Sequence, residues 1–364
     1  MCQICNLRRG VLDDARKSAF EQRMVSALND AAMIVMTSVG HRTGLFDEMA
    51  GKSAASSVEI AKRAGLDERY VREWLGAMAC SGVVEVDADT GRYALPDEHA
   101  AMLTRASAAN MAVSAQFIAL VGSVEDDVVA CFRSGGGVPY SRYGRFHEVM
   151  AEESAQTVVA ALEGAILPLV PGLQQRLREG ISVLDVGCGR AQALLQLAEY
   201  FPRSYFTGFD LSEEAIAWAR ARARARGLAN VSLRVRDLSD FDTTAPEAAF
   251  DLVTTFDAIH DQAKPAALLN GIRRSLAEGG VYLAQDIKGT GTHAGDVAHP
   301  LGTLLYTISC MHCMTVSLAQ GGDGLGAMWG EKLARQMFAD AGFGSVEVHE
   351  LEHDVMNYYY VCRA

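Results

Sequence analysis

The sequence predicts an α/β protein whose C-terminal part is a doubly wound, mostly parallel sheet and whose N-terminal part is mostly helical. Three observations support this prediction. Short apolar runs such as 181–186 are typical of strands buried on both faces of a sheet. A glycine turn, Gly187–Gly189, follows that run and leads into an apolar segment with helical spacing. Two further strand patterns, 345–351 and 357–362, close the chain.

The N-terminal part has the order of a winged helix. Residues 20–39 form a long helical pattern, and shorter helices are expected over 58–64 and 70–80, followed by a hairpin over 83–95. Such a module often binds DNA. Between residues 53 and 104, however, five Lys or Arg stand against nine Asp or Glu, a net charge of −4. This balance argues against a phosphate-facing helix and favours a role in dimerisation and in walling a substrate pocket.

Length and charge limit the possible functions. The 364 residues suffice for two domains, and 49% hydrophobic residues indicate a globular chain. We expect a winged-helix and dimerisation domain over 1–105, a helical linker and lid over 106–165 and a cofactor-binding domain over 166–364. The net charge of −12 would repel nucleic acid, so a small-molecule substrate is expected.

Cysteines and leader patterns indicate a cytoplasmic protein. No signal peptide is apparent, and eight cysteines without one are typical of reduced thiols. Cys2 and Cys5 form an isolated pair, more typical of a frayed terminus than of a zinc or redox site. Two uncharged windows, 106–124 and 297–322, contain too many polar residues to predict a membrane span, so no membrane partner is expected.

The glycine turn indicates a nucleotide-containing ligand that carries positive charge. Glycines let the main chain approach a ligand, and Asp210, at the end of the next strand, suits a carboxylate that accepts ribose hydroxyls. The dinucleotide fingerprint fails here, because Gln192 replaces its third glycine. Asp185 would repel a pyrophosphate but would attract a cation. An NAD-binding domain is therefore the less favoured alternative.

The residues 183–189 resemble the first motif of class I S-adenosylmethionine (SAM) methyltransferases. This resemblance implies a Rossmann-like sheet of seven strands with the last one reversed, SAM as cofactor and S-adenosylhomocysteine as product. Residues 231–238 and 250–257 resemble the third and fourth strands of that family. The expected cofactor residues are Asp185, Gly187, Gly189, Asp210, Leu211, Asp237, Leu238, Phe256, Asp257 and Tyr143. A winged helix ahead of the SAM domain resembles the plan of small-molecule O-methyltransferases and implies a homodimer.

A segment before the cofactor domain is a candidate lid. Residues 111–132 are expected to form a helix, and the glycine cluster 135–137 after it is a plausible hinge. Tyr140, Tyr143 and Phe146 follow and could close over a bound cofactor, burying it from water. The alternative is that these aromatic side chains only pack the domains together.

His260 is the best candidate for a catalytic base. It follows the fourth strand, at the sheet edge where ligands bind. His260-Asp261 resembles the His-Asp of plant-type O-methyltransferases, in which the histidine removes the substrate proton. Gln285-Asp286 stands where those enzymes place a glutamate that steers the histidine, although at an offset. The alternative role for His260 is to cap the next helix.

A second concentration of soft side chains spans 306–314 and 321–330. Cys310 and Cys313 supply one pair of metal ligands where zinc needs four, so no metal is expected. We expect these residues to wall a pocket for a small thiol or sulfide, with His312 assisting deprotonation. The expected pocket residues are Tyr140, Phe146, Tyr306, Cys313 and Trp329.

Four stretches (69–75, 257–265, 306–314 and 324–330) resemble a narrower group of winged-helix SAM methyltransferases of bacteria and some animals. That group has been associated with methylation of hydrogen sulfide and methanethiol. The resemblance therefore implies S-methylation of a small thiol. Two alternatives stay open: an O-methyltransferase of a phenolic or hydroxylated metabolite, and a SAM-sensing regulator that binds DNA.

Overall fold

The computed structural model describes residues 12–364, which fall into two compact units that divide between Ala119 and Leu120. Each unit is described by itself. The division lies inside the segment 106–165, for which a linker is predicted. The Cys2 and Cys5 pair lies outside the described residues, and its role stays a prediction.

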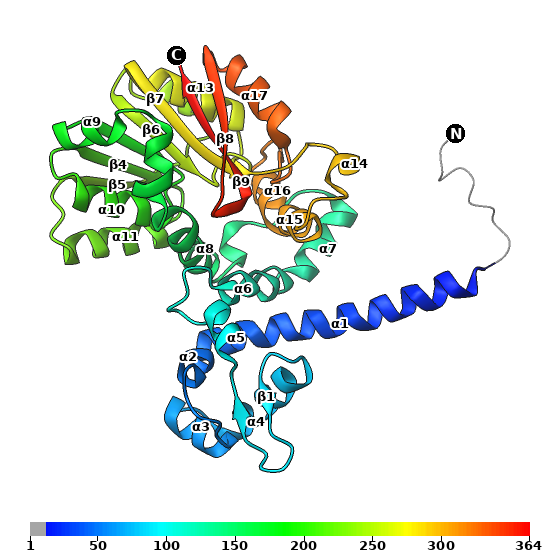
Figure 1. Cartoon of the computed structure of the whole chain (residues 1–364). Coiled ribbons are helices and arrows are strands. Elements are labelled where there is room, and N and C mark those ends of the chain that lie inside the picture. Colours follow the sequence, from blue (N-terminus) through cyan, green and yellow to red (C-terminus); the bar gives the residue numbers. More distant parts are fainter. Residues whose placement is uncertain (1–11) are drawn as a thin grey trace. The chain divides into compact units, whose positions relative to one another are not determined.

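The first unit contains a winged helix (Figure 1). Its elements are α1 (Asp14–Thr43), α2 (Leu45–Met49), α3 (Ser57–Ala64), α4 (Glu68–Cys80), β1 (Glu85–Val86), β2 (Tyr93–Ala94) and α5 (Asp97–Leu103). The strands β1 and β2 pair antiparallel, as the hairpin pattern predicts. Gly44 and Gly65 end α1 and α3 in the left-handed conformation, which costs glycine little. α3 starts at Ser57, one residue earlier than expected, and Ser56 caps it through a capping box with Glu59.

The charged residues of α4 pair with one another. Arg72 binds Glu68 at 2.6 Å, and Arg69 binds Glu73. Each pair is spaced i, i+4 on the exposed side of the helix. The basic groups of this helix therefore already have acidic partners within it.

The expected helix over 111–132 is wrong, because the structure divides it into α6 (Met111–Gly122) and α7 (Glu125–Ser134). The Ser123 hydroxyl donates to the carbonyl of Leu120 at 2.6 Å. A serine that bonds its own backbone competes with the helical ladder, so the break falls there. The connection to the sheet then comprises η2 (Tyr140–Arg142), α8 (Phe146–Ser154), η3 (Ala155–Val159), η4 (Leu162–Ile166), η5 (Leu167–Leu169) and α9 (Leu173–Glu179).

The second unit is built on a seven-stranded sheet of order β5-β4-β3-β6-β7-β9-β8. Its strands are β3 (Ser182–Val186), β4 (Tyr205–Asp210), β5 (Val231–Val235), β6 (Phe250–Phe256), β7 (Leu276–Ile287), β8 (Ser345–Leu351) and β9 (Asp354–Arg363). β3 to β7 pair parallel, and β9 runs antiparallel to both of its neighbours. The predicted Rossmann-like sheet with a reversed last strand is confirmed. The order reverses between β3 and β6, and ligands bind at such a switch point.

Helices cover both faces of this sheet (Figure 1). Val183 and Leu252 point to one face and pack with α9, α10 (Gln192–Tyr200) and α11 (Glu213–Ala225). Leu184 and Val253 point to the other face and pack with α12 (Phe241–Thr244), α13 (Pro265–Ser275) and α17 (Gly330–Asp340). Alternate residues of each strand therefore serve two cores, which explains the continuous apolar runs in the sequence.

One described helical segment, Gly302–Ala319, is long and apolar enough to cross a membrane, with a mean hydropathy of 1.2. It comprises α15 (Gly302–Ile308), the π-helical turn η6 (Ser309–Cys313) and α16 (Met314–Ala319), after the short α14 (His293–Asp296). His312 and Val316 are fully buried in the second unit. This burial is typical of a core helix, and the predicted cytoplasmic location stays a prediction.

Candidate functional site

A cavity of about 540 Å³ opens at the switch point of the sheet. It is lined by the ends of β3, β4 and β6, by the turn after β5 and by the segment 140–154. All ten expected cofactor residues line it: Asp185, Gly187, Gly189, Asp210, Leu211, Asp237, Leu238, Phe256, Asp257 and Tyr143. The structure thus gathers into one place residues that lie more than a hundred positions apart in the sequence.

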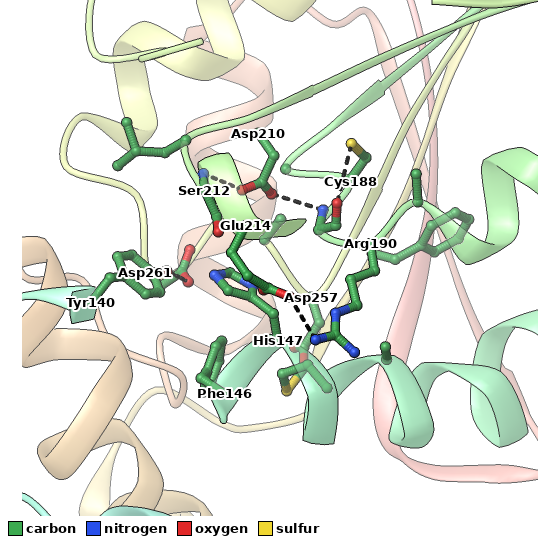
Figure 2. A pocket seen from close by; sticks show the side chains of 18 of the residues that line it. Tyr140, Phe146, His147, Cys188, Arg190, Asp210, Ser212, Glu214, Asp257 and Asp261 are labelled. Atoms are coloured by element: carbon green, nitrogen blue, oxygen red, sulfur yellow. Dashed lines mark hydrogen bonds and ion pairs between the residues drawn. The ribbon is translucent and has the colours of Figure 1, made fainter. Parts of the chain in front are cut away.

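The glycine turn is fastened by Asp210 (Figure 2). One carboxylate oxygen accepts the Gly189 N–H at 2.7 Å, and the other accepts the Ser212 N–H at 2.8 Å. Each oxygen therefore already has one backbone donor, which the sequence did not reveal, and each keeps a lone pair for a ligand. A Cβ on Gly187 would lie 2.6 Å from the Cβ of Ala258, so only glycine lets β3 and β6 end side by side.

Two carboxyls of the cavity are largely shielded from water: Asp185 is 3% exposed, and the Asp257 side chain is 25% exposed. Burial raises the pKa of Asp185 to about 7, although its hydrogen bond from Thr254 at 2.8 Å acts in the opposite direction. Burial likewise raises the pKa of Asp257 to about 7. A cation in the cavity would restore the charged form of both, since an opposite charge lowers a carboxyl pKa.

The aromatic segment expected as a lid lies against the π-helical turn. Phe146 stacks on His312 with ring centroids 3.7 Å apart, and the Tyr143 hydroxyl donates to the carbonyl of Met311. The Tyr140 hydroxyl donates to Asp261 (Figure 2). A Cβ on Gly137 would come within 2.0 Å of the carbonyl oxygen of Thr315, so the chain passes very close there. Tyr140, Tyr143 and Phe146 therefore line the cavity, and their closure over a cofactor stays a prediction.

His260 lies behind the cavity wall, close to the carboxylates of Asp286 and Asp257. Its Nδ1 lies 2.7 Å from Asp286 and 3.8 Å from Asp257. Trp329 Nε1 and the Ile287 N–H also donate to the same Asp286 oxygen, at 3.1 Å and 2.8 Å. Asp286 therefore orients the imidazole. It takes the position of the steering glutamate of plant-type O-methyltransferases, although the sequence places it at an offset. Burial lowers the pKa of His260, but the charge of Asp286 outweighs it and the pKa lies well above its ordinary value.

The expected soft substrate pocket does not form around the cavity. Cys313 is buried beside His260, and Trp329 is buried against Asp286. Tyr306 lines a separate cavity with Cys310 and donates to Asp296 at 2.8 Å. Of the five expected pocket residues, only Tyr140 and Phe146 line the cavity at the switch point. Residues of 306–330 face different directions because a helix and its π-helical turn distribute them, which a linear run cannot show.

The two expected catalytic histidines are both buried and neither lines the cavity. His260 is 3% exposed and His312 is 1% exposed. Ala258 and Asp261, on either side of His260 in the chain, do line it. Burial, together with the neighbouring His260 and His147, lowers the pKa of His312 well below its ordinary value. Arg190 and His147 also line the cavity and were not predicted as site residues; the position of Arg190, directly after Gly189, was the available signal.

Asp257, His260 and Asp286 could in principle hold a metal ion, since one potential ligand atom from each lies within 4.8 Å of the others. The three groups already satisfy one another in part, because the imidazole donates to Asp286. No metal is assigned to them, and the expected absence of a metal stays a prediction.

Each of the two units matches a known family model. Residues 31–105 match the family model of the Rv2258c-like winged HTH domain, and residues 177–342 match a methyltransferase domain model. The protein thus carries a methyltransferase domain of the class I type behind a winged helix-turn-helix domain. The predicted enzyme class, a methyltransferase, is confirmed at the level of this domain.

Curated relatives match part of the chain. A fatty-acid O-methyltransferase of Mycolicibacterium smegmatis is 32% identical over 110 residues, or 30% of this chain and 38% of that protein. The nocamycin O-methyltransferase of Saccharothrix syringae is 40% identical over 78 residues, or 21% and 27%. The chain thus spans less than two fifths of the length of these relatives.

Solved structures match nearly the whole chain at low identity. The mitomycin 7-O-methyltransferase has a TM-score of 0.67 and 16% identity, covering 96% of this chain and 100% of that one. Human N-acetylserotonin methyltransferase, solved with SAM, has a TM-score of 0.65 and 15% identity, covering 98% and 99%. These likenesses show the shared fold.

Proposed function

We propose that the protein transfers a methyl group from SAM to a hydroxyl oxygen of a small molecule. The pairing of His260 with Asp286 beside the cavity carries this proposal, because an alcohol or phenol needs a base to become a nucleophile. The names of the relatives support oxygen as the acceptor, since the fatty-acid, nocamycin and mitomycin enzymes are all O-methyltransferases.

The cavity residues fit SAM. The carboxylates of Asp185, Asp210, Asp237 and Asp257 line the cavity and suit a ligand with a positive sulfonium. Among the described residues, one oxygen of Asp257 has no hydrogen-bond partner. Bound SAM would supply an activated methyl group whose sulfur leaves without charge, so the protein needs no acid for the leaving group.

His260 is proposed to accept the proton of the hydroxyl. Its Nδ1 is held by Asp286, so Nε2 is the proton-accepting atom of the neutral ring. The Cys313 thiol also hydrogen-bonds this imidazole, and the substrate hydroxyl would replace that contact. The Asp286 carboxylate stabilises the imidazolium that forms. Asp286 thus acts as a positioning residue, and Trp329 holds Asp286 in turn. The hydroxyl must enter at the part of the wall made by Ala258 and Asp261, the neighbours of His260 that line the cavity.

We do not propose a small thiol as the methyl acceptor, although the resemblance to the narrower group of methyltransferases implies one. None of the relatives named above is a thiol methyltransferase. The sulfur-bearing residues expected to form its pocket also lie outside the cavity, with Cys313 buried and Cys310 at the separate cavity. Both observations favour the hydroxyl alternative.

A direct assay separates the two acceptors. The purified protein is incubated with SAM and two panels, one of phenols and hydroxylated aromatic metabolites and one of sulfide and methanethiol. Mass spectrometry then detects methylated product together with S-adenosylhomocysteine. We expect turnover in the hydroxyl panel; turnover restricted to the thiols would contradict the proposal.

We also propose that the protein forms the predicted homodimer. In α1 the side chains of Phe20, Met24 and Leu28 are exposed at helical spacing within the first unit, 61%, 46% and 68% respectively. Such an apolar stripe suits the same stripe of a second copy. Light scattering coupled to size-exclusion chromatography tests this, and substitution of Met24 and Leu28 by Glu should yield monomers if the stripe is the contact.

A further inference from the structure

The loop 257–264 joins β6 to α13 and carries His260, and the segment 317–326 fixes its main chain. Donors of that segment bind three carbonyl oxygens of the loop: the Gly326 N–H binds His260 at 3.1 Å, the Ser317 hydroxyl binds Gln262 at 2.8 Å and the Asp323 N–H binds Ala263 at 2.9 Å. Asp261, the residue after His260, lines the cavity. Its side-chain contacts therefore decide how the cavity wall beside His260 is placed.

The Asp261 carboxylate is tied to the lid segment by Tyr140, which lies beside it in Figure 2. The Tyr140 hydroxyl donates to one carboxylate oxygen, and Gln262, a residue of the same loop, donates to the other at 3.2 Å. Within residues 12–364, Tyr140 is thus the donor that reaches Asp261 from outside the loop. Burial raises the pKa of Asp261, and the Tyr140 hydrogen bond acts in the opposite direction. The bond offsets part of the cost of burying this carboxylate.

Tyr140 itself has a firm support. Two residues before it, the Val138 N–H donates to the Thr315 hydroxyl at 2.9 Å, and three residues after it, the Tyr143 hydroxyl donates to the carbonyl of Met311. Both acceptors belong to the helical segment 302–319. The chain is therefore anchored on each side of Tyr140, and the phenol can hold Asp261 at a defined position.

We propose that Tyr140 is a positioning residue for methyl transfer: its hydroxyl holds Asp261, and with it the adjoining His260, in line with the acceptor hydroxyl. The inference rests on the proposed function, in which His260 accepts the proton of that hydroxyl. Misplacement of a reacting group by about 1 Å can cost about 100-fold in rate. One hydrogen bond at this wall is therefore enough to affect the reaction.

Four variants isolate the contact. Tyr140→Phe removes the hydroxyl and keeps the ring, which packs edge-on against His312 at 5.3 Å. Asp261→Ala removes the acceptor, whereas Asp261→Asn keeps an oxygen that can accept the same hydrogen bond. Tyr306→Phe is the matched control, because the Tyr306 hydroxyl also donates to an aspartate, Asp296 at 2.8 Å, but lines the separate cavity.

Steady-state kinetics with SAM and the best hydroxyl acceptor measure the effect. Tyr140→Phe should lower kcat about 10- to 100-fold while the KM for SAM stays unchanged, because the hydroxyl aligns the base and does not bind the cofactor. Tyr306→Phe should leave both parameters unchanged. Asp261→Asn should keep more activity than Asp261→Ala, since it restores the acceptor for Tyr140.

A double-mutant cycle tests whether Tyr140 acts through Asp261. In the Asp261→Ala background the bond is already absent, so adding Tyr140→Phe should change kcat by less than about 2-fold. Hydrogen exchange gives a second readout that needs no acceptor. The peptide containing 257–264 should exchange faster in Tyr140→Phe than in the wild type, and at the wild-type rate in Tyr306→Phe.

Two results would overturn the inference while the proposed function stands. One is an equal loss of kcat in Tyr140→Phe and Tyr306→Phe, and the other is a cost of Tyr140→Phe that is the same with and without Asp261. Failure of the proposed function looks different, because the wild-type protein would then methylate no hydroxyl. In that case unchanged exchange of 257–264 in Tyr140→Phe would also reject the hold of Tyr140 on the loop.

Discussion

His260 and His312 are both buried in the second unit, yet their surroundings shift the pKa values of the two rings in opposite directions. His260 has the Asp286 carboxylate at 2.7 Å, and its pKa lies well above the ordinary value. His312 lies among the rings of Phe146 at 3.7 Å and Tyr143 at 4.7 Å, and burial holds its pKa well below that value. Burial alone thus does not set the charge of a histidine; the partner does.

This difference divides the roles that the sequence assigned to both histidines. Only His260 has a carboxylate that orients the ring and stabilises its protonated form. Within residues 12–364, Nε2 of His312 has no hydrogen-bond partner, and its ring packs against aromatic side chains. We therefore propose His260 as the base and His312 as a packing residue behind the aromatic wall.

The largest expected effect is the loss of the base. His260→Ala should lower kcat/KM for the hydroxyl acceptor by about 10²- to 10⁴-fold, the usual contribution of a general base. His312→Phe keeps an aromatic ring against Phe146 and should change kcat/KM by less than about 10-fold, below that range. Steady-state assays with SAM and the best acceptor measure both. A larger loss in the His312 variant would reverse the assigned roles.

Asp286→Asn should shift the pH dependence of the reaction. A raised pKa keeps His260 protonated near neutral pH, so activity should rise with pH as the neutral ring forms. Without the Asp286 charge the pKa of His260 falls, and the rising limb should move to lower pH by about one to three units. Because the ring also loses its orientation, kcat should fall. Profiles of log kcat/KM against pH measure the shift.

The surface variant Glu247→Gln is the control for that experiment. Glu247 is an exposed carboxylate paired with Arg274. Its removal changes the net charge by the same amount without touching His260. A rising limb that stays in place in Asp286→Asn, or moves equally in both variants, would contradict the role of Asp286.

His312→Phe should remove part of the acid sensitivity of the fold. Because the folded pKa of His312 is lowered, the unfolded chain binds more protons below about pH 6.5, and stability falls as the pH drops through that range. One such group contributes at most about 1.4 kcal/mol per pH unit. Urea unfolding at pH 7.5 and 5.5 should show a smaller difference in the variant. An unchanged difference would mean that His312 does not carry this effect.

The smallest expected effect belongs to Trp329→Phe. The variant keeps a ring against Phe338 but loses the N–H that donates to Asp286 at 3.1 Å. Without this donor the negative charge of Asp286 acts more strongly on His260, so the pKa of His260 should rise. The rising limb of the pH profile should then move to higher pH by less than about one unit, and the lost hydrogen bond should lower the stability by about 1 kcal/mol. A downward shift as large as that of Asp286→Asn would show that Trp329 itself fixes the carboxylate.

The cofactor side of the site was predictable because its signals are local. Gly187, Gly189 and Asp210 stand at the ends of recognisable strands, and parallel strands place such ends at one edge of the sheet. The contact of His260 with Asp286 was only partly predictable, since it joins two strand ends whose exact register the sequence does not show.

The acceptor side was not predictable from composition. The run 306–314 contains Cys, Met and His together, but its π-helical turn buries Cys313 while Tyr306 and Cys310 face a separate cavity. Arg190 was not predicted, because an arginine after a glycine turn has no recognisable role until the structure places it in the wall of the cavity.

Nitrogen NMR of the imidazole rings tests the central claim most directly. With ¹⁵N-labelled protein at pH 7, the account predicts that His260 shows the shifts of a protonated ring and that His312 shows those of a neutral ring, with His260→Gln and His312→Phe assigning the signals. A neutral His260 beside a protonated His312, or two neutral rings, would contradict it.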